Sequence, residues 1–293
     1  MFARRVLPSF ILLFALALWI GDSSVAAQDR GSSVPRVSPN ATVSQTIGIT
    51  EVRITYGRPS AEGRTIFSND GLVPFGDVWR TGANEATTVS FSTPVQIQGK
   101  SLDAGTYGFF TIPGPETWTL IFNETANQWG AYNYDSSKDV LRVEVEPESA
   151  DAREMLTFSF HNVTDTSTTA HLHWSETLVP FTITTNTPEI LQSQAEEAVA
   201  TADDWRRPLQ YVGYALQNDI LLEDALEWIN RSIEIEEHFT NLRMKANVLA
   251  ALDRHSQAVE TANAALSTAE SMDETPDGVE ALRNQINSWK SEM

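Results

Sequence analysis

The chain contains no cysteine among its 293 residues. This absence excludes a disulfide scaffold, a thiol nucleophile, a thiolate metal site and a lipid-modified cysteine. The folded protein must therefore be stabilised by its hydrophobic core. A core of ordinary size is possible, because a chain of this length suits one large or two ordinary domains.

Basic residues are scarce, with 20 Lys and Arg against 39 Asp and Glu, which gives a formal net charge of −19 at pH 7. Affinity for nucleic acids comes largely from Lys and Arg side chains that displace counterions from phosphates. We therefore expect no nucleic-acid partner. The simplest interpretation of the acidity is that it keeps the protein soluble.

Long apolar runs are missing except near the start of the chain. Residues 10–20 are apolar, follow two arginines and precede the small residues of SSVAAQ. This order is typical of a secretory signal, and the run is shorter than the ~20 residues that span a membrane. We predict a signal peptide at 1–27, a disordered linker at 28–37, and a periplasmic or secreted protein with no membrane span after cleavage.

A strand pattern dominates the chain from residue 41 to residue 184. Apolar and polar residues alternate in short segments such as EVRITY, TWTLIF, VLRVEV and MLTFSF, and Gly, Pro, Asn and Asp separate the segments. Eight or nine such segments without a helical period between them favour an antiparallel β-sandwich, with a small barrel as the alternative. We place this domain at residues 38–185.

The period changes to that of helices after Asn186, where Thr187 fits the N-cap and Pro188 the first helical position of a first helix. An offset of 33 residues then aligns small residues with one another, among them Ala225 with Ala258 and Ser232 with Ala265. This offset is close to the tetratricopeptide period of 34 residues.

The predicted architecture is therefore α+β and multidomain, with an antiparallel β-sandwich followed by an α-helical hairpin-repeat, tetratricopeptide-like tail over residues 187–293. Two repeat units with flanking helices could form a groove for a protein or peptide partner. They could equally pack on the sandwich, and the pattern does not decide between these arrangements.

Residues 38–184 carry long motifs that read, in order, SPNATVSQTIGITEVRITYGRPSAEGRTIF, LVPFGDVWRTGANEATTVSF, AGTYGFFTIPG, WTLIFNETANQWGAYNYD, DVLRVEVEP and VPFTI. These motifs resemble successive blocks of a bacterial family known as the domain of unknown function 2911. The resemblance implies an exported bacterial protein that often carries a helical repeat tail. It implies no established activity, so it assigns no catalytic residues.

One of these motifs, at residues 72–91, gathers polar residues in front of an apolar run. Gly82 allows a tight bend, and Asn84 can hydrogen-bond backbone groups that the bend leaves unpaired. Arg80 and Glu85 are close enough in sequence to form an ion pair. The favoured interpretation is a structural clasp that holds the loop.

The competing interpretation of the same loop is a binding site for a small anion or a sugar acid. Arg58, Arg64 and Arg80 would then hydrogen-bond a carboxylate, and Trp79 would form an apolar wall. Nearby aromatic residues raise a related choice. Trp129 and Tyr132 either pack on the core or form a platform for sugar rings.

Three histidines lie close together in FHNVTDTSTTAHLHW. If the turn centres near Thr166, His161 lies opposite His171, and His173 lies one step further on the same sheet face. Three imidazoles with an open coordination position are typical of a hydrolytic zinc site. The alternative, which we favour, is a polar sheet face that happens to carry histidines.

The common catalytic motifs are missing: the chain has no G-x-S-x-G elbow, no H-E-x-x-H helix, no phosphate-binding loop and no dinucleotide fingerprint. We therefore predict an exported, non-catalytic binding or protein-interaction protein without a cofactor. The alternatives are a metal-dependent hydrolase that uses the three histidines, with zinc as the metal, and a carbohydrate-binding sandwich.

Overall fold

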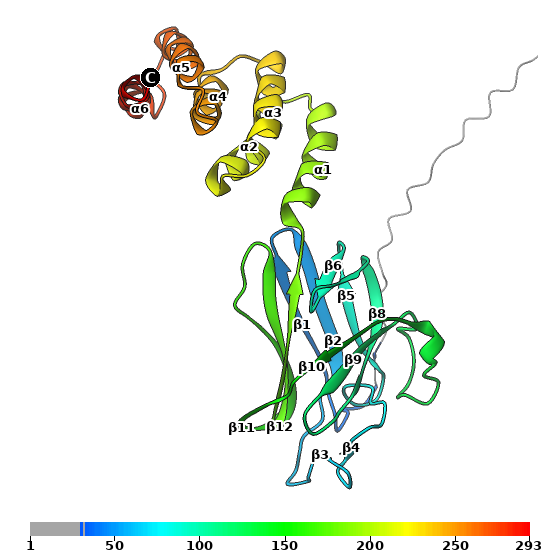
Figure 1. Cartoon of the computed structure of the whole chain (residues 1–293). Helices are drawn as coiled ribbons and strands as arrows, with labels where there is room; N and C mark the ends of the chain where they lie inside the picture. The colour runs from blue at the N-terminus through cyan, green and yellow to red at the C-terminus, as the bar shows by residue number, and fades with distance from the viewer. Residues whose placement is uncertain (1–29, 32) are drawn as a thin grey trace, which may run out of the picture.

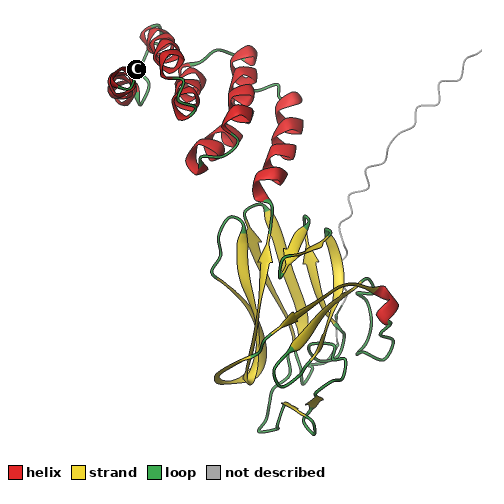
Figure 2. Cartoon of the chain, viewed as in Figure 1, coloured by secondary structure: helices red, strands yellow, loops and turns green. Residues whose placement is uncertain are grey.

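The computed structural model describes residues 30, 31 and 33–293, so the predicted signal peptide at 1–27 lies outside the described residues. Within them, a part built of strands is followed by a part built of helices (Figures 1 and 2). The predicted α+β class is confirmed. None of the helices in this described part has the length and apolar character needed to cross a membrane.

Alternating apolar residues build the first sheet. In β2, for example, Val52 and Ile54 are fully buried, whereas Glu51 and Arg53 are exposed. The sheet is antiparallel and has six strands in the order β1-β2-β5-β8-β9-β10. These strands are β1 (Asn40–Ile47), β2 (Thr50–Gly57), β5 (Thr87–Phe91), β8 (Gly105–Ile112), β9 (Trp118–Asn123) and β10 (Asp139–Val145).

The second antiparallel sheet has four strands in the order β11-β12-β6-β7. They are β11 (Glu148–His161), β12 (Ser167–Thr184), β6 (Val95–Ile97) and β7 (Lys100–Leu102). A short parallel pair, β3 (Phe67–Ser68) with β4 (Val73–Pro74), lies at the end of the sheets away from the helices (Figure 1).

The two sheets bury one shared core, and an aromatic cluster occupies one end of it. The rings of Trp79 and Trp174 stack with centroids 5.9 Å apart. Phe67 of β3 contacts both of these rings edge-on and also lies 4.8 Å from the ring of Trp118. Such aromatic pairs stabilise a core beyond the area that they bury. They also give the loop around Trp79 a rigid base.

The helical part contains α1 (Thr187–Ala200), α2 (Arg206–Asn218), α3 (Leu222–Ile235), α4 (Phe239–Ala251), α5 (His255–Glu270) and α6 (Val279–Ser291). Each helix contacts the next, and the row of helices leads away from the sandwich (Figure 1). Small residues that align at the 33-residue offset are fully buried between the helices, for example Ala225 in α3 and Ala258 in α5.

The junction between the two parts is formed by tight contacts around Asp165. The N-cap of α1 is Asn186, not the predicted Thr187, and its side chain makes no capping hydrogen bond. The Thr187 hydroxyl instead donates to the Asp165 carbonyl oxygen at 2.5 Å, and the Tyr214 hydroxyl donates to the Asp165 carboxylate at 3.0 Å. Gly48 has φ +57°, and a Cβ there would lie 2.4 Å from the Asp165 carbonyl oxygen. Only glycine fits this position.

Candidate functional site

The loop that follows Trp79 is attached to the end of the first sheet. Trp79 and Thr111 of β8 exchange two backbone hydrogen bonds of 2.8 and 2.9 Å. The Trp79 indole N–H donates to the Gly82 carbonyl oxygen at 3.2 Å. Beyond it, a Cβ on Gly57 would lie only 2.0 Å from the Ala83 carbonyl oxygen. The loop therefore approaches the end of β2 as closely as glycine allows.

Two residues of this loop have left-handed backbone conformations, Thr81 with φ 55° and Asn84 with φ 64°. Asparagine adopts this region readily, but a β-branched threonine does so only when its surroundings hold it there. Thr81 is fully buried, and its carbonyl oxygen accepts a 2.8 Å hydrogen bond from the Thr87 hydroxyl. The loop is therefore a fixed platform.

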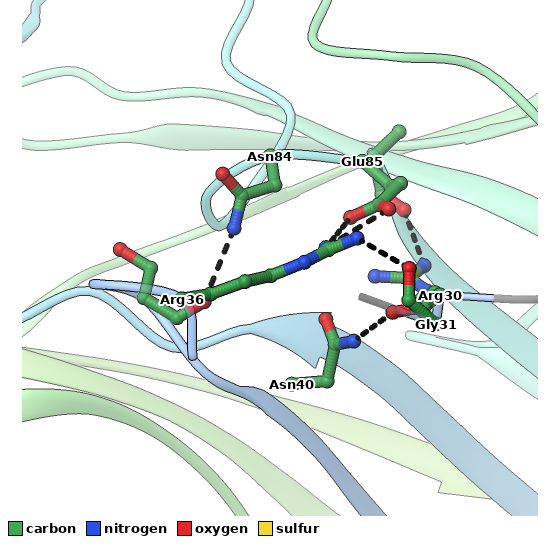
Figure 3. A network of polar contacts seen from close by, with 8 residues as sticks. Arg30, Gly31, Arg36, Asn40, Asn84 and Glu85 are labelled. Atoms are coloured by element: carbon green, nitrogen blue, oxygen red, sulfur yellow. Dashed lines mark hydrogen bonds and ion pairs between the residues drawn. The ribbon is translucent and has the colours of Figure 1, made fainter. Parts of the chain in front are cut away.

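Glu85 is a buried carboxylate that pairs with Arg36 (Figure 3). Nη1 of Arg36 donates to both carboxylate oxygens, at 2.9 and 2.7 Å. Burial alone would raise the pKa of Glu85, but the hydrogen bonds from Arg36 and the backbone, with the charges of Arg36 and Arg30, hold that pKa below its usual value. Glu85 is therefore ionised and its charge is satisfied.

Arg36 belongs to an N-terminal segment that lies against this loop, which we call the strap (residues 30, 31 and 33–40). At its start, Nη2 of the buried Arg30 donates to the Ala86 carbonyl oxygen at 2.6 Å. Near its end, Nδ2 of Asn84 donates to the Ser38 carbonyl oxygen at 3.1 Å (Figure 3). Polar side chains at three places therefore hold the strap on the sandwich.

These contacts correct two expectations from the sequence. Glu85 pairs with Arg36 and not with Arg80, and the disordered linker predicted for residues 28–37 does not describe Arg30 or Arg36, which are both engaged. Sequence reasoning missed both arginines because it sought a partner for Glu85 nearby in sequence. The sequence did contain a chemical signal for this pairing. A carboxylate just before a buried strand requires a positively charged partner, and Arg30 and Arg36 directly precede the domain.

Three of the predicted binding residues meet at one cavity of about 360 Å³. They are Arg64, Trp79 and Arg80, and the cavity also borders the ring-stacked Trp174 and the acidic Glu62. Its remaining lining residues come from the strap, from the segment after β2, from the start of β4 and the residue before it, and from the loop after Trp79: Val37, Ser38, Pro59, Ser60, Leu72, Val73, Gly82 and Ala83. Two cations and one anion give this lining a net positive charge.

The two arginines of the cavity differ in how they are held. Arg64 donates from Nε to the Ala61 carbonyl oxygen at 2.9 Å and from Nη2 to the Ser60 carbonyl oxygen at 2.6 Å. In the part of the chain that the structure describes, Nε of Arg80 is buried and has no hydrogen-bond partner. Burial lowers the pKa of Arg80, an effect that the nearby Tyr132 opposes. Arg80 therefore keeps an unused donor.

Arg58 lies outside this cavity lining, contrary to the expectation that three arginines converge. Its Nε donates to the Leu156 carbonyl oxygen and its Nη2 to the Thr157 hydroxyl, each at 2.9 Å. These bonds join the end of β2 to β11 of the other sheet. Arg58 therefore has a structural role in holding the sheets together.

Trp129 and Tyr132 stand on the neighbouring loop, which the site loop holds by its backbone. The Gly130 N–H donates to the Asn84 carbonyl oxygen at 3.0 Å, and Glu85 forms an isolated bridge with Trp129. The two side chains are 54% and 83% exposed, so they do not pack in the core. They are large aromatic surfaces open to solvent.

The three histidines share a sheet face as predicted, with a different register. His161 pairs with Thr169 and His171 pairs with Ser159, which centres the turn at Asp165, one residue earlier than expected. His161 and His171 are therefore diagonal neighbours, and their rings stack with centroids 4.2 Å apart. Burial, followed by the charge of His161, lowers the pKa of His171.

The third histidine is engaged elsewhere. Nδ1 of His173 accepts from Nε of Arg153 at 3.2 Å, and Nε2 lies 2.9 Å from the Asp151 carbonyl oxygen. Across residues 30, 31 and 33–293, no group of three or more His, Asp or Glu side chains is arranged to hold a metal ion. The geometry therefore does not support the three-histidine zinc site considered from the sequence.

Comparison with known families identifies the sandwich. Residues 38–183 match the family model described as a protein of unknown function, DUF2911. This segment is a DUF2911 domain. The match covers about half of the chain and ends within β12, so the helical tail and most of the strap lie outside the DUF2911 domain. No curated protein matches the chain.

Proposed function

We propose that this protein is an exported, non-catalytic binding protein whose DUF2911 domain receives a small anion such as the carboxylate of a sugar acid. The supporting observation is the cavity of about 360 Å³ lined by Arg64, Trp79 and Arg80. Small-molecule sites combine apolar walls with a few placed polar groups. Guanidinium groups suit carboxylates because they donate two parallel hydrogen bonds.

Binding is proposed in preference to catalysis because the sequence carries none of the common catalytic motifs. Export, to the periplasm or the outside of the cell, is part of the proposal and is supported by the signal-like first 27 residues. Mass spectrometry of the protein recovered from its native host tests this part. We expect a chain that begins at Gln28, and an unprocessed chain in the cytoplasm would contradict export.

The binding proposal is tested by calorimetric titration with glucuronate and with glucose, its uncharged counterpart. We expect glucuronate to bind and glucose not to bind. Arg64→Met and Arg80→Met should each reduce the binding free energy by about 1.5–3 kcal/mol, the range for hydrogen bonds to charged groups. Arg53→Met removes the same charge from an exposed position of β2 and should leave binding unchanged. Equal losses in all three variants would indicate only a general charge effect.

A second candidate function, carbohydrate binding on an aromatic platform, is favoured by the 54% and 83% exposure of Trp129 and Tyr132. Sugar rings stack on exposed aromatic faces, and Tyr and Trp combine an apolar body with a polar tip. Neutral oligosaccharides should then quench tryptophan fluorescence in the wild-type protein and not in Trp129→Ser. Quenching that persists in Trp129→Ser would remove this candidate.

The helical tail is proposed to be tetratricopeptide-like and to bind a protein or peptide partner. The support is the 33-residue offset, which brings the buried Ala225 and Ala258 to equivalent places in α3 and α5. Close helix pairing at these positions predicts that Ala225→Leu and Ala258→Leu each cost about 1–3 kcal/mol of unfolding free energy. Ala264→Leu, at an exposed position of α5, is the matched control. Equal stability of all three variants would contradict close pairing.

A further inference from the structure

Two imidazole rings lie against each other on the face of the second sheet that points away from the core. His161 stands at the end of β11 and is exposed, and His171 stands on β12 and is half-buried. Their ring centroids are 4.2 Å apart and their planes meet at 25°. Diagonal neighbours on an antiparallel pair are within reach of long side chains, and rotation of one ring about its χ2 bond would point a nitrogen of each ring at one ion.

The neighbouring His173 cannot join them without losing its own partners. One of its ring nitrogens accepts from Arg153 at 3.2 Å, and the other lies 2.9 Å from the Asp151 carbonyl oxygen. The guanidinium of Arg153 would also repel a metal ion at that position. The available donor set is therefore two imidazoles, not three.

The number of donors decides which metal chemistry fits. Structural zinc sites use four protein ligands and catalytic zinc sites use three, so two imidazoles do not make either. Imidazole binds Cu²⁺ and Ni²⁺ well, both ions accept tetragonal geometry with water in the remaining positions, and Cu²⁺ has the highest affinity in the divalent series. The formal charge of −19 also raises the local concentration of cations.

We propose that His161 and His171 form a surface site that binds Cu²⁺ through both imidazoles, with solvent completing the coordination. The Ser159 hydroxyl lies 2.9 Å from Nε2 of His161, so we assign Nδ1 of this ring to the ion. This site binds a metal ion without hydrolytic chemistry. It is independent of the arginine-lined cavity, which lies between the loops around Trp79.

Titration of the purified, untagged protein with CuCl₂ at neutral pH, followed by calorimetry and electron paramagnetic resonance, tests the proposal. We expect binding with two nitrogen ligands. His161→Asn and His171→Asn should each weaken Cu²⁺ binding by at least about 10–100-fold. This is the loss of affinity that follows removal of a residue that only hydrogen-bonds a metal ligand, and removal of the ligand itself should cost no less. ZnCl₂ should bind more weakly than CuCl₂, following the divalent series.

His173→Asn is the matched control, because this residue stands on the same strand and the same face as His171. It should leave Cu²⁺ affinity unchanged. A loss in His173→Asn equal to that in the other two variants would mean a three-histidine site and overturn the proposal. Unchanged affinity in His161→Asn would overturn it too. Circular dichroism of each variant verifies folding, and the nitrogen count in the wild-type protein gives a readout that requires no variant.

Discussion

Arg80 and Glu85 stand in the same loop of the DUF2911 domain, but the protein satisfies their charged groups very differently. Both oxygens of Glu85 accept from Arg36, and Arg30 lies near enough to lower its pKa further. Nε of Arg80, within the described chain, is buried without a partner. Buried polar groups are nearly always paired, so an unpaired donor beside a cavity needs an explanation.

This difference indicates a structural role for Glu85 and supports the proposed binding role of Arg80 in the same loop. A charged side chain whose hydrogen bonds are all made stabilises the folded state, and its removal leaves the groups that it paired with unsatisfied. An unpaired buried donor stabilises no partner and costs free energy, which an acceptor on a ligand in the cavity would offset. The loop is therefore a clasp on the Glu85 side and the proposed site on the Arg80 side.

The largest effect is expected from Gly57→Ala, which should disturb both sides of the loop at once. The new Cβ would lie 2.0 Å from the Ala83 carbonyl oxygen, so the loop must move away from β2. We expect a loss of about 3 kcal/mol, the upper end for overpacking, because the atom it meets is backbone. Denaturant unfolding measures this loss. Gly213→Ala in α2, where the space is open, is the control and should stabilise the helix.

Glu85→Gln tests the clasp alone and should cost about 2 kcal/mol of unfolding free energy, because it removes the charge that satisfies Arg36. Circular dichroism during urea unfolding measures the change. A variant as stable as the wild type would show that the strap is held without this ion pair.

The same pair predicts a dependence of stability on pH. The folded-state pKa of Glu85 is lowered from 4.5, so its stabilising contribution is present above that value and is lost as pH falls through the lower, folded-state pKa. Wild-type stability should therefore fall more steeply than that of Glu85→Gln as the solution is acidified below about pH 5. Parallel pH profiles would contradict the assignment.

The sequence predicted the parts of this comparison that depend on local pattern. Alternation predicted the buried faces of the strands, and the histidines share a face because a register error of two residues keeps every side chain on its side. Arg58 shows the limit, since its partners at Leu156 and Thr157 belong to a strand about a hundred positions away. A hydrogen bond between two sheets leaves no periodic signal in either strand.

The strap was the least predictable element for the same reason. Its hold on the sandwich depends on single polar contacts, such as Arg30 with the Ala86 carbonyl oxygen, and not on an apolar face. Val37 remains 91% exposed, so hydrophobic periodicity could not indicate that this stretch is attached.

Asn84→Ala should have a moderate effect, about 1 kcal/mol of unfolding free energy. It removes the 3.1 Å bond to the Ser38 carbonyl oxygen and places a less tolerant residue at φ 64°. Asn84→Gly separates the two causes, because glycine accepts this φ but cannot make the bond. Equal stability of the alanine and glycine variants would mean that the lost bond alone explains the effect. Thermal unfolding of both variants provides the measurement.

The smallest effect on stability is expected from Arg80→Met, within about 0.5 kcal/mol of the wild type. Burial lowers the pKa of Arg80, which means that folding disfavours its charged form, and methionine retains the apolar part of the side chain without that cost. The same variant should bind glucuronate more weakly, so its stability and its affinity change independently. Chemical unfolding and calorimetry on one preparation compare the two quantities. If Arg80→Met loses as much stability as Glu85→Gln, both charges hold the fold, and the division of this loop into clasp and site is wrong.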